Sequence, residues 1–221
     1  MSEPILTKML VFSGMYSDED FFPDGAEIVD FSDLGGVTCY CDPESERSIR
    51  EALSGEPANA IHWIDSGDYH YVTLFYLEKI SEPFALVLID NHSDDQACAF
   101  DAGCLSCGSW VARARETLPR MLETHWMKDG AVPESGTGLP VYISIDKDVL
   151  SEEYYRTDWD QGKMTLPGLM KALELLFHSR RVLGVDICGG LTISKGARAE
   201  DLALNRLTDS ELQDFIMGFW V

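Results

Sequence analysis

The sequence predicts an α/β domain with three layers, α/β/α, in which helices cover both faces of a mostly parallel sheet. Short apolar runs alternate with stretches of helical periodicity along the 221 residues. The later apolar runs are hydrophobic at every position, as expected for strands buried on both faces of a parallel sheet. The length suits one domain with a substantial core, so we expect a single domain over residues 1–221.

Seven apolar runs are predicted as strands, and four segments between them as helices. The strands are Met9–Ser13, Glu27–Phe31, Val37–Cys41, Ala60–Asp65, Phe84–Asp90, Val141–Asp146 and Val182–Cys188. The helical segments are Pro43–Leu53, Tyr69–Ile80, Ser109–His125 and Leu166–Arg181, and a loop is expected over Lys128–Gly138.

Local signals set the ends of these helices. Thr165 is placed as the N-cap of the Leu166–Arg181 helix, with Pro167 in its first turn. Pro119 is expected to disturb the helix within Ser109–His125, because proline removes a backbone donor. Near the C-terminus, Thr208 and Glu211 have capping-box spacing before an apolar run, which predicts a helix start.

The charge balance is strongly acidic, with 17 Lys and Arg against 38 Asp and Glu and a formal net charge of −21. Such a surface repels phosphate backbones and anionic lipids, so neither nucleic acid nor a membrane is an expected partner. No stretch approaches eighteen consecutive apolar residues, and the N-terminus lacks a secretory pattern. We expect a cytoplasmic protein that acts on a small molecule, and the sequence leaves open whether it is a monomer or a homo-oligomer.

Six cysteines occur, and free thiols are the favoured interpretation. Nothing in the sequence indicates an oxidising compartment, in which disulfides would persist. Cys104 and Cys107 have the spacing of metal ligands, but Cys39 and Cys41 are poorly spaced as a partner pair for a structural zinc site.

Three of the predicted buried strands end in acidic residues. Phe84–Asp90 leads into His92 and Asp94, Val141–Asp146 leads into Asp148, and the last strand contains Asp186. Ligands of open α/β sheets bind beyond the carboxyl ends of the strands, so these carboxylates are expected at one crevice.

The spacing within these segments favours metal binding. In extended backbone, residues i, i+2 and i+4 project to one side, so Asp90, His92 and Asp94 can converge, and so can Asp146 and Asp148. Clustered carboxylates repel one another without a cation, and oxygen ligands mixed with imidazole suit Mn²⁺, with Fe²⁺, Co²⁺ or Zn²⁺ also possible. An isolated Asp at a strand end is often only a turn former or helix cap. Two such motifs together are much harder to explain in that way.

These motifs resemble those of the ureohydrolases, the superfamily of arginases, agmatinases and formiminoglutamases. Asp90-Asn-His92-Ser-Asp94 resembles their Asp-Ala-His-x-Asp signature, and Ser144-Ile-Asp146-Lys-Asp148 resembles their Ser-x-Asp-x-Asp signature. Weaker similarities follow the family order: Ser66–His70 resembles a Gly-Gly-Asp-His element, Gln161–Thr165 a Pro-Gly-Gly-Leu-Thr segment, and Val185–Ile187 a Leu-Asp-Ile segment.

The resemblance implies an arginase-like fold and a site with two divalent ions, Mn²⁺ above all, that activate water to attack an sp² carbon bearing nitrogen. By the family pattern, Asp90 and Asp146 would bridge the ions. His70 and Asp94 would complete one ion's ligands, and His92 and Asp148 the other's. Asp94 would also be catalytic, as a hydrogen-bond acceptor for the attacking hydroxide.

Several family positions carry other residues here. His70 stands one place late in its motif, which leaves Tyr69 as an alternative, although Tyr is a poor ligand for such ions. Cys107 stands where the family has a proton-shuttling His, so it is the candidate for that catalytic role. Gly189 stands where a Glu grips the guanidinium, and its lack of a side chain is expected to leave open space beside the metals.

These departures leave three functions open. The first is a binuclear hydrolase of an amidine, guanidine or amide other than arginine, unless Glu200 or Asp201 folds back to replace the missing Glu. The second is a single-metal hydrolase that resembles the histone deacetylases, against which the retention of Asp94 and Asp148 argues. The third is a metal-binding or regulatory protein without turnover.

Overall fold

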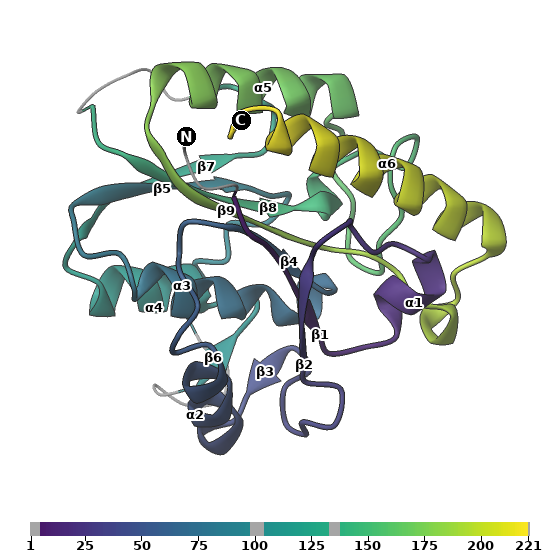
Figure 1. Ribbon diagram of the computed structural model, residues 1–221, viewed down its shortest axis with the longest axis horizontal. Coiled ribbons are helices and arrows are strands. Elements are labelled where there is room, and N and C mark those ends of the chain that lie inside the picture. The colour runs from purple at the N-terminus through teal and green to yellow at the C-terminus, as the bar shows by residue number, and fades with distance from the viewer. Residues whose placement is uncertain (1–4, 98–103, 133–137, 221) are drawn as a thin grey trace.

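The computed structural model describes residues 5–97, 104–132 and 138–220. A central sheet has the strand order β2-β1-β4-β9-β8-β5-β7, and every neighbouring pair in it is parallel. The strands are β1 (Thr7–Val11), β2 (Glu27–Asp30), β4 (Ile61–Ile64), β5 (Phe84–Ile89), β7 (Met121–Met127), β8 (Val141–Asp146) and β9 (Val182–Cys188). Helices flank the sheet on both sides, so the predicted three-layer α/β fold is confirmed (Figure 1).

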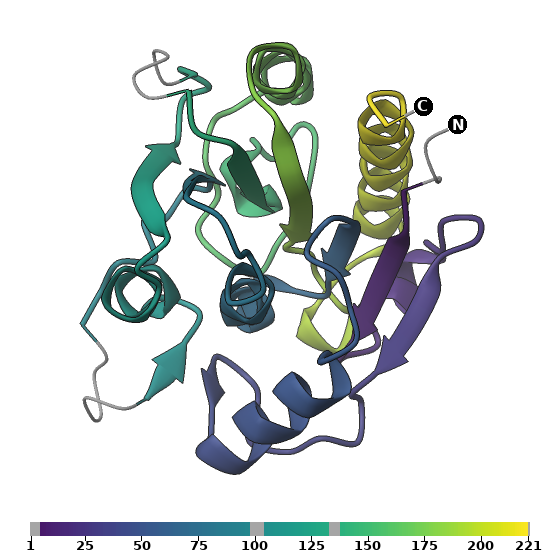
Figure 2. The same cartoon turned by 60° about the vertical axis from the view of Figure 1, so that its left-hand side comes forward.

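The two outer layers follow from the alternation of side chains along the strands. In β5, Val87 packs into a hydrophobic cluster on one face, and Leu86 packs into a second cluster on the other. The first cluster includes residues of α1 (Met15–Glu19), α5 (Leu166–Ser179) and α6 (Ala199–Met217). The second includes residues of α2 (Pro43–Ala52), α3 (Thr73–Leu77) and α4 (Trp110–Thr117), and Figure 2 shows the sheet between the two sets of helices.

Two predicted elements need correction. The Ser109–His125 segment contains a helix, α4, which ends at Thr117 before Pro119 as the proline predicts, but the residues that follow form the edge strand β7, which was not predicted. The Val37–Cys41 strand is reduced to β3 (Tyr40–Cys41), which pairs antiparallel with β6 (Leu105–Ser106) outside the main sheet.

The ends of the helices are partly as predicted. Thr165 caps α5, and its hydroxyl accepts from the Gly168 backbone N–H at 3.1 Å. The capping box at Thr208 is wrong, because α6 begins at Ala199 and Thr208 lies inside it. The Tyr69–Ile80 segment is a 3₁₀ turn (Gly67–Val72) that leads into α3.

Some predictions are only partly covered by the described residues. Residues 133–137 of the predicted Lys128–Gly138 loop lie outside them, and so does Cys98. Cys39, Cys41, Cys107 and Cys188 are free thiols, as predicted. Within the described ranges, no helix has the length and apolar character needed to span a membrane.

Candidate metal centre

The carboxyl ends of three neighbouring strands, β9, β8 and β5, form the floor of the site. Asp90 directly follows β5, Asp146 ends β8, and Cys188 ends β9. The register between β8 and β9 sets Asp146 opposite Cys188. Parallel pairing therefore brings the ends of chain segments far apart in sequence to one edge of the sheet.

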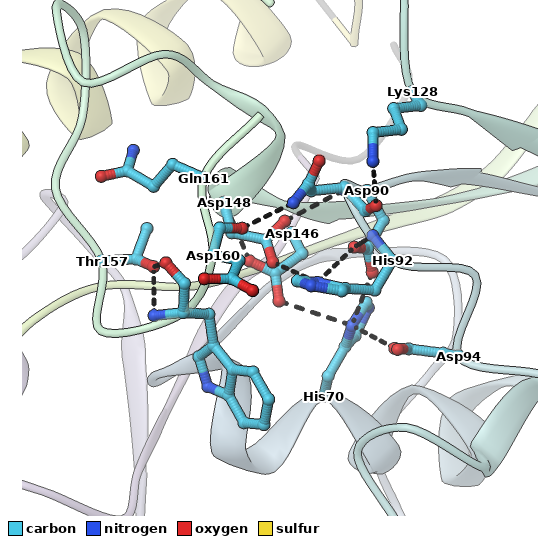
Figure 3. Close-up of polar contacts among 12 residues, drawn as sticks. His70, Asp90, His92, Asp94, Lys128, Asp146, Asp148, Thr157, Asp160 and Gln161 are labelled. Carbon is cyan, nitrogen blue, oxygen red and sulfur yellow. Dashed lines mark hydrogen bonds and ion pairs between the residues drawn. The ribbon is translucent and has the colours of Figure 1, made fainter. Parts of the chain in front are cut away.

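The first group of donor atoms surrounds His70, which the 3₁₀ turn after β4 carries (Figure 3). Its Nδ1 lies 3.0 Å from Asp94 Oδ2, 3.3 Å from Asp90 Oδ2 and 3.6 Å from Asp146 Oδ2. Tyr69, the alternative from the sequence, instead stacks on Phe12 with ring centroids 4.4 Å apart. The one-residue offset in the motif is therefore absorbed by the turn, and His70 is the residue that faces the carboxylates.

The second group surrounds His92, in the segment that follows β5. Its Nδ1 lies 2.7 Å from Asp148 Oδ2 and 3.7 Å from Asp90 Oδ1. Asp90 is thus shared, with one carboxylate oxygen toward each histidine. All six residues predicted as metal ligands meet at this edge of the sheet, in two groups joined by Asp90.

The hydrogen bonds behind His70 leave its Nδ1 as the atom that faces the cluster. Asp186 Oδ1 accepts from the Ser144 hydroxyl at 2.6 Å, so the Ser144 oxygen is free to accept from His70 Nε2–H at 2.8 Å. In the neutral imidazole, Nδ1 then carries a lone pair that points at carboxylates. Either a proton on Nδ1 or a cation must lie between these groups.

A cation fits this site on three grounds. His70 and Asp90 are each only 1% exposed, and both His70 Nδ1 and Asp90 Oδ2 are buried without a hydrogen-bond partner. Burial, and then the neighbouring Asp94, raises the pKa of Asp90 well above its ordinary value. Burial, and then Asp148, raises the pKa of Asp146 to about 7. Divalent ions would relieve both the repulsion and the missing partners.

Asp94 is held by a contact that the sequence motifs do not contain. Its Oδ2 accepts from the indole Nε1–H of Trp110 at 2.7 Å, and Trp110 has no exposed surface. The backbone of Asp94 has φ of +48°, in the left-handed region that Asp tolerates better than most residues. The turn and the indole together aim this carboxylate at His70.

Lys147 supports the centre from behind. It lies between the two aspartates of the second motif but is fully buried, and its Nζ donates to both carboxylate oxygens of Asp209 at 2.8 Å. Asp209 belongs to α6, so this ion pair attaches the end of β8 to a helix of the outer layer. Lys147 is thus a structural cation and does not face the donor groups.

A cavity of about 290 Å³ opens above the two groups. Its other walls include Cys39, Gln96, Ser106, Cys107, Ser109 and Trp159. Among the described residues, the only charged or titratable groups that line it are those of the cluster, two thiols and the phenol of Tyr40. The space fits a small molecule with one end at the donor atoms.

Cys107, the predicted proton shuttle, lies in a wall of this cavity. Its backbone N–H donates to the Cys39 carbonyl at 2.9 Å, which continues the pairing of β3 with β6. Burial raises the pKa of the Cys107 thiol, so at neutral pH the sulfur keeps its proton. The shuttle role of Cys107 remains a prediction, and by this chemistry the thiol is a weaker acid than an imidazolium.

The expected open space at Gly189 is filled, which corrects the sequence prediction. A Cβ at this position would lie 2.6 Å from Asp146 Oδ1 and 3.0 Å from the Lys147 backbone N, and Gly189 has φ of +97°. Glu200 and Asp201, considered as replacements for the missing Glu, both pair with Arg198 and do not line the cavity. No described carboxylate outside the cluster is therefore available in the cavity for a guanidinium.

The position of Asp186 also differs from the prediction. It lies behind His70, because β9 continues for two residues beyond it, and Cys188 occupies the position at the crevice. The Cys188 thiol donates to Asp146 Oδ2 at 3.3 Å and falls in one group with His70 and Asp146. Cys188 is not among the ligands predicted from the sequence, although Asp186-x-Cys188 has the same i, i+2 spacing as Asp146-x-Asp148.

Removing the Ser144 hydroxyl is expected to weaken metal binding without removing any ligand. Ser144→Ala leaves His70 Nε2 without its partner and removes one donor from Asp186, so the imidazole loses its fixed orientation. We expect the affinity for the ion beside His70 to fall about 10- to 100-fold, as for other supporting contacts of metal sites. Competition with a metal chelator measures this. Equal affinities in Ser144→Ala and the unsubstituted protein would contradict the orienting role.

Comparison with known proteins agrees with the fold. No family model matches the sequence. An uncharacterized protein of Thermotoga maritima is 29% identical over 197 residues, which cover 82% of this chain and 78% of that protein. The arginase of Bacillus caldovelox matches in structure with a TM-score of 0.66 at 11% identity, covering 95% of this chain and 98% of that one.

Two further solved structures have the same architecture. Proclavaminate amidino hydrolase of Streptomyces clavuligerus gives a TM-score of 0.65 at 13% identity, over 99% of this chain and 93% of that one. A triple mutant of a T. brucei arginase-like protein, bound with Mn²⁺, gives 0.63 at 14% identity, over 99% of this chain and 91% of that one. The structural neighbours are ureohydrolases, and this chain has their fold.

Proposed function

We propose that this protein, which has the ureohydrolase fold, is a hydrolase of a linear C–N bond that uses two divalent metal ions, and that arginine is not its substrate. The observation that carries the proposal is the pair of donor groups that share Asp90 beneath a cavity of about 290 Å³. Each group offers one imidazole Nδ1 and several carboxylate oxygens, a donor set that suits Mn²⁺ or a related divalent ion.

The residues that would hold the ions follow from the two groups. His70 and Asp94 would hold one ion, His92 and Asp148 the other, and Asp90 and Asp146 would be shared between them. Ions bound there would lower the pKa of water and polarise the substrate's carbonyl or imine. Mn²⁺ is our first choice, supported by the Mn²⁺-bound arginase-like structure with the same fold.

Side chains of the cavity would accept a proton from the attacking water and return one to the leaving group. Asp94, held by the Trp110 indole, is oriented to accept a proton from the attacking water. Cys107 is the candidate to return a proton to the leaving nitrogen, and Ser106 and Ser109 lie beside it in the same wall. Trp159 forms another side of the cavity, and its ring lies 6.1 Å from the His92 ring, centroid to centroid.

Substrate choice is the first test. We expect arginine and agmatine to have kcat/KM values roughly tenfold to a few hundredfold below those of the best neutral amide, formamide or urea. The reason is that no cavity carboxylate outside the metal cluster pairs with a guanidinium, a contact that contributes ~1.5–3 kcal/mol per charged hydrogen bond.

The assay uses Mn²⁺-loaded protein at mildly alkaline pH with guanidines, ureas, formamides and acetylated amines. Asp146→Ala serves as the control for contaminating enzymes. Efficient urea release from arginine or agmatine that Asp146→Ala removes would show that the substrate assignment is wrong.

Two alternative functions are distinguished by the number of ions bound per chain and by whether any substrate is hydrolysed. A single-metal, deacetylase-like hydrolase would bind one ion per chain, whereas Asp94 and Asp148 here give each histidine its own carboxylate. A regulatory protein without turnover would bind two ions and hydrolyse nothing in the panel. We further propose a cytoplasmic location and a small-molecule substrate.

A further inference from the structure

We propose that Cys188 supplies a sulfur ligand to the ion beside His70, so that the two metal positions differ in chemical class. This inference rests on the proposed two-metal centre and assigns a ligand that neither the aspartate motifs nor the comparisons contain. The position beside His70 would be a mixed sulfur, nitrogen and oxygen site, and the position beside His92 a nitrogen and oxygen site.

The first argument is the location of the sulfur. Cys188 Sγ lies 3.3 Å from Asp146 Oδ2, and both atoms lie within 4.8 Å of a ring nitrogen of His70. Metal–ligand bonds of about 2.0–2.3 Å place two donors on one ion roughly 3 to 4.5 Å apart. The spacing of these three donor atoms matches that of ligands on a single ion.

The second argument is independent of the cysteine. His70 Nδ1 is buried, has no hydrogen-bond partner and points into this same group of atoms. Asp90 Oδ2, 3.3 Å away, is likewise buried without a partner. These two orphaned atoms indicate a missing cation at the place that the sulfur adjoins.

The third argument is the geometry of β9. The register pairs Cys188 with Asp146, and Cys188 has no exposed surface. Asp186, two residues earlier on the same side of the strand, holds Ser144 and through it His70. One strand thus carries both a residue that orients the histidine and a thiol at the crevice.

Binding of the ion by Cys188 exchanges the thiol proton for the metal. The S–H bond of Cys188 breaks as the sulfur–metal bond forms, and the proton leaves to solvent. A thiolate favours Zn²⁺, Co²⁺ or Fe²⁺ over Mn²⁺ at this position, because soft sulfur ligands bind the thiophilic ions more strongly. The position beside His92 has no sulfur among its described donors and keeps the preference for harder ions.

The test uses absorption of the cobalt-loaded protein. Metal-free protein is loaded with Co²⁺, and we expect a near-ultraviolet thiolate-to-cobalt band that is lost in Cys188→Ser and in Cys188→Ala. Cys107→Ser, which removes a thiol from a wall of the same cavity, is the matched control and keeps the band. In competition between Zn²⁺ and Mn²⁺, the Zn²⁺ preference of the unsubstituted protein should fall at least about tenfold in the Cys188 variants.

The outcomes separate this inference from the proposed function. Unsubstituted protein with two cobalt ions and no such band overturns the sulfur ligand but leaves the hydrolase proposal standing, and this holds even if the variants fail to fold. A band that persists in the Cys188 variants also overturns it. A Cys188-dependent band in protein that hydrolyses nothing in the substrate panel supports the sulfur ligand and contradicts the proposed hydrolase function. Protein that binds no divalent ion contradicts both.

Discussion

Asp90→Asn is expected to reduce hydrolysis by about 10³-fold or more, equivalent to about 4 kcal/mol of barrier, and to leave fewer than two ions per chain. Asp90 is the residue whose two carboxylate oxygens face different histidines, at 3.3 Å from His70 Nδ1 and 3.7 Å from His92 Nδ1. An amide in its place offers only one neutral oxygen. Elemental analysis of the purified variant and the rate on the best substrate of the panel measure the two effects.

The melting temperature of Asp90→Asn also distinguishes a metal ligand from a residue with a purely structural role. In chelator-treated protein, Asp90→Asn removes one of several mutually repelling carboxylates and should raise the melting temperature. A structural role would predict the opposite, because a buried acid that holds the fold leaves a gap in its contacts. A variant that keeps two ions per chain shows that the site assignment is wrong.

Asp95→Asn is the matched control for that experiment. Asp95 follows Asp94 in sequence but is partly exposed and pairs with Arg115 away from the cluster. Its substitution should change neither the ion count nor the rate, because an exposed ion pair contributes little. Loss of ions in both variants would indicate a nonspecific effect of lowered negative charge.

The aspartate motifs were predictable because each follows a buried strand, and parallel pairing brings the ends of β5 and β8 together. The reason given for their convergence is wrong, because the residues after the strands are not extended: Asp94 has φ of +48°, and Asp148 lies in a 3₁₀ turn (Lys147–Val149). The position of Cys188 at the end of a strand, with the i, i+2 spacing, could also have been noticed, but it lies outside the family motifs. Sequence spacing could not predict the role of Trp110, because its contact with Asp94 joins a helix residue to a turn 16 residues earlier.

The incorrect predictions have physical causes of a different kind. At Gly189, the missing side chain suggested empty space, but Asp146 and the Lys147 backbone fill it. The strand β7 was not predicted, because the pattern of Ser109–His125 indicates only a helix that Pro119 disturbs. A missing side chain does not predict an open space, and a continuous sequence pattern does not predict where a helix ends. Residues distant in sequence decide both.

The metal-free protein is expected to lose stability as pH rises from about 4 to about 7, and the metal-loaded protein to resist this loss. Burial and the Asp148 charge raise the pKa of Asp146 from 3.8 to about 7 in the folded chain. The folded state therefore keeps a proton that the unfolded state has released across this interval, and ionising the folded carboxyl costs free energy.

The other members of the cluster act in the same direction. Burial and Asp94 raise the pKa of Asp90, so its ionisation in the folded chain is also unfavourable. Burial lowers the pKa of His70, but Cys188 and then Asp90 and Asp94 raise it well above its ordinary value, so His70 stays protonated in the metal-free fold. The stability from that pairing is lost as pH rises past its folded pKa. All three residues lower the stability of the metal-free protein as pH increases.

The effect is large enough to measure by thermal unfolding. For Asp146 alone, a pKa raised from 3.8 to about 7 corresponds to on the order of 4 kcal/mol, or roughly 10 °C in melting temperature for a chain of this size. Bound ions replace the protons and become more tightly held as pH rises, since ligands must be deprotonated. The gap between metal-loaded and chelated protein should therefore widen from pH 5 to pH 7.

Another buried acid serves to check the origin of this slope. Burial raises the pKa of Glu19 to about 8, and the charges and hydrogen bonds that act on it come from residues outside the predicted ligands, such as Asp209, Lys147 and Asn205, so Glu19 contributes to the loaded and chelated protein alike. The difference between the two melting curves isolates the cluster, and Asp146→Asn should flatten the pH dependence of the chelated protein. Identical melting temperatures for loaded and demonstrably metal-free protein at both pH values would contradict a buried cation site, because the carboxylates would then ionise in the fold without penalty.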